Sequence, residues 1–267
     1  MAKVLKLDRY INVDTEYETG ERVAYIIRKY GTDSSSDTIL YIEGKPTGTI
    51  DSDVAPLYVT SSNLLGPLDL GDLYYVIPPE TKFKFTGASG SKMRLIGDII
   101  QLDPGEKLGS PYTDRYERQF DHYITKKEGT LTLATDEAFG ADEEKTVLEI
   151  EPKSNEIVKI NNYAGVSGSG GTIDEGYFAV VMYYNNKPLE YLKTSGFGPG
   201  IDILSMPLPP ADSTNEVPFT FKDNPKEVPG PNEFVFKIRN ISGSDLSPDT
   251  GSAWSFTLKL LAEYIRK

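Results

Sequence analysis

The strongest constraint on the fold of this chain is a strand pattern that occurs twice. Residues 82–100, KFKFTGASGSKMRLIGDII, and residues 235–265, VFKIRNISGS followed after an insertion by WSFTLKLLAEYI, share one arrangement. In both, an alternating apolar–polar run ends four residues before Ser-Gly-Ser. An apolar run with an acid in the same place then follows, Asp98 in the first copy and Glu263 in the second. Alternation of this kind predicts β-strands with one buried face.

A second pair of segments precedes each copy. TILYIEGKP (38–46) matches VVMYYNNKP (180–188), because each has an aromatic-rich strand, a two-residue polar turn and then Lys-Pro. Upstream of each lies a further strand with a tyrosine near its end, VAYIIRKYG (23–31) and IVKINNYAG (157–165). The segments keep the same order in both halves. We therefore predict a tandem duplication.

Other alternating runs fill much of the remaining chain. TLTLAT (130–135) and TVLEIEP (146–152) alternate apolar with polar residues, and the 17 tyrosines suit half-buried strands. The 24 glycines and 18 prolines gather in turn clusters between such runs. No convincing stretch has the apolar spacing of an amphipathic helix. The sequence predicts an all-β fold of two tandem antiparallel β-sandwiches of the jelly-roll type, with little or no helix.

The expected boundary lies in a segment rich in proline, glycine and charge. We predict a first β-sandwich over residues 1–106, a connector over 107–129 and a second β-sandwich, the internal repeat of the first, over 130–267. The connector also carries three tyrosines and a phenylalanine, so we expect it to pack against a domain.

Composition limits the function classes. The formal net charge of -12 opposes the phosphates of nucleic acids and anionic membranes, so neither is an expected partner. The absence of cysteine excludes disulfides, thiol nucleophiles and Cys-ligated zinc. We find no signal peptide or membrane-spanning run, which predicts synthesis in the cytoplasm without membrane insertion.

Residues 249–251, Asp-Thr-Gly, match the triplet at the catalytic aspartate of aspartic proteases. Those enzymes need two aspartates that share a proton, each in a buried loop after an apolar strand. Here Asp249 follows Pro248, only sixteen residues come after Gly251, and the first copy has no such triplet. We interpret the stretch as a reverse turn, in which proline presets φ and glycine tolerates a positive φ.

Two further kinds of loop have alternative interpretations. AGVSGSGGTIDEG (164–176) lacks the spacing of a phosphate-binding loop and precedes a strand, so we predict a flexible hairpin tip. Acidic loop clusters offer oxygen ligands for calcium but lack EF-hand spacing, and solvated surface charge is the favoured interpretation. The clusters are Asp33 and Asp37, Asp51 and Asp53, and Asp136, Glu137, Asp142, Glu143 and Glu144.

The single histidine and the single tryptophan are the remaining candidates. His122 has no nucleophile motif nearby, so we interpret it as an ordinary surface or inter-domain residue. Trp254 lies on an alternating strand, which favours a core position over a sugar-binding one. Paired carboxylates for glycoside hydrolysis stay open as an alternative, because their separation is spatial.

The repeated pattern of KFKFTGASGS with LIGDII and VFKIRNISGS with LKLLAEYI, on a cysteine-free chain with short Gly/Ser hairpins, resembles virion structural proteins. These are the jelly-roll capsid, turret, spike or decoration subunits of viruses and phages. The resemblance implies a non-enzymatic subunit of a virus or phage particle that self-associates or docks onto a shell. It implies no cofactor or metal, and a place in the virion. The alternative is a carbohydrate- or receptor-binding β-sandwich module.

The expected partners are other virion or shell proteins and further copies of the chain, in a trimer or pentamer. Tyrosine is enriched at protein interfaces, and loop tips tolerate insertions. The longer loops of the second half, 164–176 and 243–254, are therefore predicted to face a partner, which includes a glycan or receptor. The candidate residues are Gly165, Ser167, Ser169, Asp174, Asp245, Asp249 and Trp254.

Overall fold

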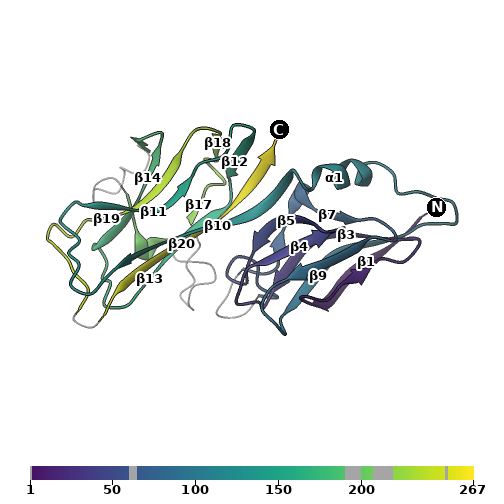
Figure 1. The fold of residues 1–267 in the computed structure, drawn as a ribbon, viewed down its shortest axis with the longest axis horizontal. Helices are drawn as coiled ribbons and strands as arrows, with labels where there is room; N and C mark the ends of the chain where they lie inside the picture. Colours follow the sequence, from purple (N-terminus) through teal and green to yellow (C-terminus); the bar gives the residue numbers. More distant parts are fainter. Residues whose placement is uncertain (1, 60–64, 190–199, 207–218, 250–251) are drawn as a thin grey trace. The chain divides into compact units, whose positions relative to one another are not determined.

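The computed structural model describes residues 2–59, 65–189, 200–206, 219–249 and 252–267. The chain divides into two compact units (Figure 1). The first unit comprises the residues up to Lys126 together with Glu263–Arg266, and the second comprises Lys127–Ala262 and Lys267. The segment expected as a connector, 107–129, therefore contributes residues 107–126 to the first unit. Among the described residues, none of the helices has the length and apolar character of a membrane span.

The first unit consists of two antiparallel sheets. One sheet has the order β1-β9-β3-β6, with β7 also paired to β3, and the other has the order β2-β8-β4-β5. The bounds of the first sheet are β1 Lys3–Asn12, β9 Lys92–Gln101, β3 Val23–Thr32, β6 Leu68–Asp69 and β7 Tyr75–Ile77. The bounds of the second are β2 Tyr17–Glu18, β8 Lys82–Thr86, β4 Thr38–Ile42 and β5 Lys45–Ile50. A 3₁₀ turn, η1, covers Gly71–Leu73.

The second unit also has two sheets. One has the order β17-β13-β20-β12-β18, with β10 also paired to β20, and the other has the order β11-β19-β14-β15, with β16 also paired to β14. The bounds of the first are β17 Phe219–Thr220, β13 Tyr163–Ser169, β20 Trp254–Arg266, β12 Glu156–Ile160, β18 Lys226–Pro229 and β10 His122–Leu133. The bounds of the second are β11 Glu144–Ile150, β19 Phe234–Asn240, β14 Phe178–Tyr184, β15 Lys187–Pro188 and β16 Ile201–Asp202. A 3₁₀ turn, η3, covers Ile203–Ser205.

The strand order is the same in the two units. In the first unit β2-β8-β4-β5 form one sheet, and in the second β11-β19-β14-β15 form its counterpart. In the other sheet of each unit the first strand lies beside the last, as β1 beside β9 and β10 beside β20. The last strand of each unit also pairs with the third strand. This third strand is β3 in the first unit, and in the second unit it is divided into β12 and β13. This interleaving of two antiparallel sheets is the strand order of a jelly roll, as expected from the sequence.

The repeated Lys-Pro hairpins have the same turn geometry. The central residues of the β4–β5 turn, Glu43 and Gly44, have φ of 50° and 74°. Those of the β14–β15 turn, Asn185 and Asn186, have φ of 48° and 62°. Positive φ at both central residues defines the type I′ turn, whose twist matches that of the flanking strands. Two different residue pairs therefore make the same tight hairpin.

Alternation places the apolar side chains between the sheets. On β8 the buried side chains Phe83 and Phe85 alternate with the exposed Lys82 and Lys84. In the second unit the ring of Phe178 lies against Phe139, Trp254 and Phe256, with centroid distances of 5.5, 5.2 and 4.9 Å. Burial of such a side chain contributes about 1.5–3 kcal/mol, so these clusters supply much of the stability.

A short helix, α1 (Tyr112–Arg118), lies in the expected connector and was not predicted. Tyr112 and Tyr116 pack against a buried cluster that includes Ile26 and Ile100, as expected for an aromatic-rich segment. The helix has no side-chain cap, and tertiary contacts hold it instead. The buried Arg115 donates to the carbonyl oxygens of residues 73, 74 and 122.

Candidate functional site

Strand β1 forms one edge of its sheet. It pairs with β9 over ten residues without a register shift, from Lys3 opposite Gln101 to Asn12 opposite Lys92. Within the described part of the chain, no strand pairs with its other side. A row of backbone donors and acceptors along such an edge is a template for pairing with another chain.

The phase of the hydrogen bonds shows which residues of β1 face outward. The Val13 N–H donates to the Ser91 carbonyl on the β9 side at 3.0 Å, whereas the Asn12 N–H points the other way and donates to the Tyr17 hydroxyl at 3.0 Å. Backbone direction alternates along a strand, so odd-numbered residues bond to β9 and even-numbered residues direct their backbone groups to the open side. The residues that do so are Val4, Lys6, Asp8 and Tyr10.

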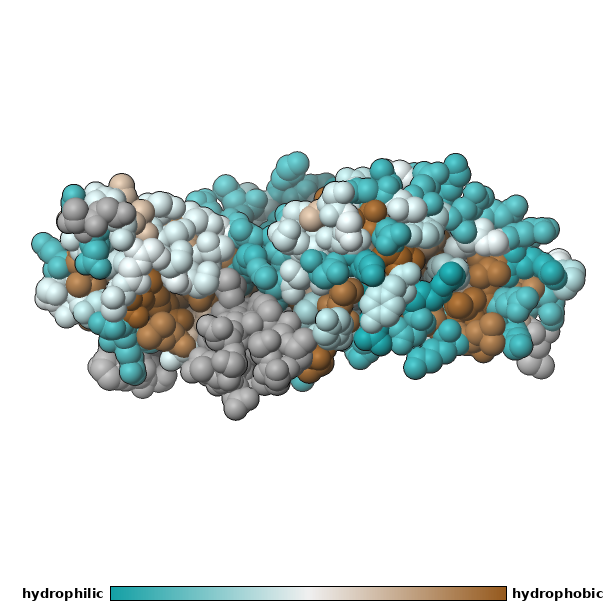
Figure 2. Space-filling view, turned by 90° about the horizontal axis from the view of Figure 1, so that it is seen from below, coloured by the Kyte–Doolittle hydropathy of each residue, from teal (hydrophilic) through white to brown (hydrophobic). Residues whose placement is uncertain are grey.

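The side chains of these four residues share the outer face of the sheet. Val4 is 62% exposed and Tyr10 is 55% exposed. Figure 2 shows apolar residues, in brown, reaching the surface of the first unit, at the right, between hydrophilic ones. Asp8 accepts two hydrogen bonds of 3.0 Å from Arg94, whose guanidinium also lies 5.7 Å from the centre of the Tyr10 ring. The hydrogen bond from Arg94 lowers the pKa of the Asp8 carboxyl, and the carboxylate is the stable form.

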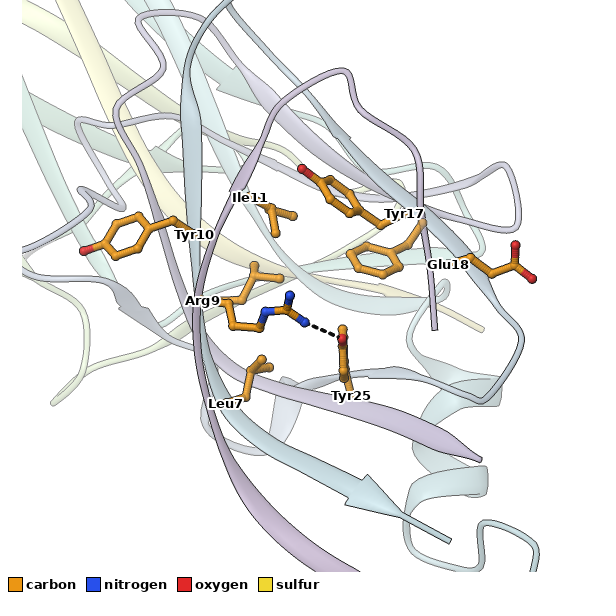
Figure 3. Close-up of a pocket in the computed structure, with 9 residues that line it drawn as sticks. Leu7, Arg9, Tyr10, Ile11, Tyr17, Glu18 and Tyr25 are labelled. Atoms are coloured by element: carbon orange, nitrogen blue, oxygen red, sulfur yellow. Dashed lines mark hydrogen bonds between the residues drawn. The ribbon is translucent and has the colours of Figure 1, made fainter. Parts of the chain in front are cut away.

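The inner side of β1 borders a pocket of about 190 Å³ between the two sheets (Figure 3). Its apolar lining is Leu7, Ile11, Phe83 and Leu95, and its polar lining includes Arg9, Tyr17, Glu18 and Tyr25. Arg9 donates to the Tyr25 hydroxyl at 2.8 Å, and the two side chains point toward each other, whereas Tyr10 points away. The Phe83 ring lies 5.8 Å from that of Tyr17 and 6.0 Å from that of Tyr25. The pocket thus combines an aromatic floor with a cationic side chain.

Strand β7 pairs with β3, and a side chain forms hydrogen bonds with the remaining edge of β7. The carboxamide of Gln119, which is 0% exposed, accepts from the Val76 N–H at 2.8 Å and donates to the Val76 carbonyl at 3.0 Å. Gln119 therefore bonds to β7 as a neighbouring strand would. As far as the described residues show, the first sheet has one strand covered in this way, whereas the long edge strand β1 has no strand on its other side.

The acids considered for calcium lie mainly in ion pairs and turns. Asp37 and Asp51 both accept from the buried Lys126 ammonium, at 2.5 and 2.9 Å. Glu137 pairs with Lys145 at 2.8 Å, and that hydrogen bond lowers the pKa of the Glu137 carboxyl. Asp33 accepts from the Lys92 N–H, and Asp51 also accepts from the Asp53 N–H. Asp142 pairs with Arg239, and Glu143 and Glu144 lie within 4.0 Å of lysine or arginine nitrogens. Asp136 lies in a turn with a φ of 62°.

The predicted partner-facing residues lie in three settings. Gly165, Ser167 and Ser169 belong to β13 and pair with β20, so the expectation of a loop over 164–176 is wrong for 164–169. Pairing with β20 overrides the low strand propensity of this Gly/Ser run. Asp174 and Asp245 are exposed in segments without regular secondary structure. The structure does not bring these residues together into one site, and their contact with a partner stays a prediction.

Trp254 is a core residue. Its side chain is 4% exposed on β20, and its ring packs edge-on against Phe178. A Cβ at Gly171 would lie 2.8 Å from the indole nitrogen, so the glycine leaves room for the ring. The core interpretation of this aromatic is therefore confirmed, and contact of the loop before it with a partner stays a prediction.

The two motifs weighed for catalysis lie at exposed or partly exposed positions. The Asp249 side chain is exposed, and its carbonyl accepts from the Ser252 N–H at 2.8 Å, the spacing of a four-residue turn. Thr250 and Gly251 lie outside the described residues. The His122 imidazole lies 3.1 Å from the Glu263 carboxylate, with its side chain 34% exposed.

Comparisons with known proteins give distant matches. The sequence matches no protein-family model and no curated protein. A turret protein of Sulfolobus turreted icosahedral virus is similar with a TM-score of 0.22 and 8% identity, over 97% of this chain and 98% of that one. A conserved protein of unknown function from Pseudomonas aeruginosa PAO1 has a TM-score of 0.20 and 6% identity, over 97% and 78%. A cupin 2 conserved barrel domain protein from Leptotrichia buccalis has a TM-score of 0.18 and 9% identity, over 97% and 88%. Similarity at these scores carries no argument about function.

Proposed function

We propose that this chain is a non-enzymatic structural subunit of a virus or phage particle, such as a minor capsid, turret, spike or decoration protein. Its partners are further copies of the chain and other virion or shell proteins. The observation that carries the proposal is the edge of β1 from Val4 to Tyr10, which pairs with no other strand among the described residues and bears exposed apolar side chains on a jelly-roll unit.

The two sides of the first sheet support an assembly role. Natural β-proteins blunt or cover edge strands, because an open edge pairs with other chains. Here Gln119 covers the edge of β7, whereas β1 presents Val4 and Tyr10 on an edge that pairs with no other strand in the described part of the chain. Retention of such an edge is costly for a monomer and useful for a subunit that joins a neighbour.

A carbohydrate- or receptor-binding module is the second candidate, and the pocket behind β1 favours it. Tyr17, Tyr25 and Phe83 supply aromatic surface, and the Arg9 guanidinium supplies hydrogen-bond donors at the same opening. Ligand sites commonly combine an apolar lining with a few polar groups that fix orientation. The volume of about 190 Å³ suits one sugar ring or a single side chain better than a large ligand.

The experiment that separates the candidates measures mass and glycan binding on the same preparation. Light scattering and native mass spectrometry of the purified chain, alone and with the particle fraction of its source, should give an oligomer or a particle-bound species. A monomer that joins no assembly and binds a glycan tightly would replace the structural role with the binding module. Loss of that binding in Arg9→Ala would then locate the ligand in the pocket.

A further inference from the structure

We propose that β1 pairs antiparallel with β1 of a second copy about a two-fold axis at Leu7. The inference rests on the proposed function only in taking the partner to be another copy of this chain. In this register Lys6 lies opposite Asp8 of the partner subunit, and Val4 lies opposite Tyr10 of the partner subunit. Both relations occur twice, because a two-fold contact is self-complementary.

The alternating direction of the backbone N–H and C=O groups along β1 restricts the registers in which two copies can pair. Only the even-numbered residues of β1 direct backbone groups outward, so they must oppose one another across the new interface. An axis at residue 6 or 8 would place Lys6 or Asp8 against its own copy, with like charges opposed. An axis at residue 5 would pair Val4 with Lys6, and one at residue 9 would pair Asp8 with Tyr10. Only the axis at Leu7 opposes opposite charges and apolar side chains together.

The charges are available for this contact. Lys6 is exposed on β1, and the two Asp8 oxygens each accept one bond from Arg94. A carboxylate has capacity for further hydrogen bonds, so Asp8 keeps its arginine while it accepts from a second copy. Opposite charges and aromatic–aliphatic pairs directly opposed across strands both stabilise a sheet.

The contact also covers apolar surface that is now exposed. Val4 and Tyr10 are 62% and 55% exposed, and each would lie against the other in the pair. One strand pair is a small interface, which predicts a reversible dimer rather than an obligate one. Because an isologous contact closes after two copies, a trimer or pentamer would require a further contact on another surface.

Cysteine cross-linking tests the register. Because the chain has no cysteine of its own, only the introduced thiols can form disulfides. A copy with Lys6→Cys and a copy with Asp8→Cys would place their Cα atoms about 5.5 Å apart, within the range of about 4.4–6.8 Å that a disulfide spans. Two Lys6→Cys copies would be about 7–8 Å apart. Under mild oxidation, the mixture should give disulfide dimers and Lys6→Cys alone should not. Equal yields in both samples, or none in either, overturn the register.

Sedimentation velocity over a concentration series tests the strand pairing itself. The Lys6→Glu substitution places a glutamate opposite Asp8 of the partner subunit, and this pair of like charges occurs twice in the dimer. The dimer dissociation constant should therefore rise about tenfold. Lys84→Glu, an equal charge change on the outer face of β8, should leave the constant unchanged. Lys6→Pro removes an N–H that does not bond to β9, so it should abolish the dimer while Lys6→Ala only weakens it.

The outcomes distinguish this inference from the function on which it rests. An oligomer that survives Lys6→Pro overturns the pairing at β1 and leaves the structural role standing. A wild-type chain that stays monomeric at every concentration but binds to its particle also overturns the pairing alone. A monomer that joins no assembly overturns both.

Discussion

Removal of the Gln119 carboxamide should destabilise the first unit selectively. Gln119→Met keeps a similar volume but leaves the N–H and C=O of Val76 without their partner, two bonds of 2.8 and 3.0 Å at a fully buried side chain. A buried group that loses its partner costs about 1–3 kcal/mol, so the two together should cost about 2–6 kcal/mol. With a denaturation slope of about 2 kcal/mol per molar urea, the midpoint should fall by roughly 1–3 M.

The assay uses the single tryptophan as a probe of the other unit. Trp254 lies in the second unit, so its fluorescence follows that unit, whereas far-UV circular dichroism follows the strands of both. In urea, Gln119→Met should shift a transition seen by dichroism and leave the fluorescence transition in place. Gln101→Met, the same change at an exposed position of β9, is the control. A Gln119→Met midpoint equal to that of Gln101→Met would refute the reasoning, and equal shifts in both probes would mean that the units unfold together.

Other substitutions test the remaining interpretations. The fragment 127–267 should unfold alone with one cooperative transition, checked by calorimetry, and a fragment without one would contradict the division into units. Trp254→Ala should cost about 3–5 kcal/mol in urea unfolding, since it empties part of the aromatic core. Asp249→Asn should change no activity, and a proteolysis assay in which it abolished cleavage would contradict the turn. The pKa of Asp8 is lowered when folded, so its ion pair stabilises above the unfolded pKa and is lost as pH falls through the folded one. The stability difference between wild type and Asp8→Asn should therefore vanish in acid, as thermal melts would show.

Elements with strong local patterns were predictable from the sequence. The alternation of Phe83 and Phe85 with lysines predicted β8, because a strand with one buried face requires it. The Lys-Pro hairpins were predictable as well, since a two-residue polar turn between strands suits the type I′ geometry. Their order along the chain also predicted the jelly-roll class.

Elements that depend on tertiary contacts were not predictable. The helix α1 is seven residues long, and the hydrogen bonds of Arg115 stabilise it rather than its own periodicity. The strand β13 contains a Gly/Ser run that reads as a loop, and only its pairing with β20 makes it a strand. The β1 edge was missed although KVLKLDRYIN places Val4 and Tyr10 among charges, because its partner β9 is distant in sequence.

In each jelly roll the first and last strands pair with each other, so the two ends of the fold lie side by side. In the first unit β1 begins at Lys3 and β9 ends at Gln101, and these residues lie opposite each other on paired strands. The second unit likewise begins on β10 and ends on β20, which pair. A segment whose two ends lie side by side can be inserted, copied or deleted with only a short link and little disturbance of its core. A link between the two ends of such a strand pair could therefore be short, which is what a circular permutation that joins residues 3 and 101 would require.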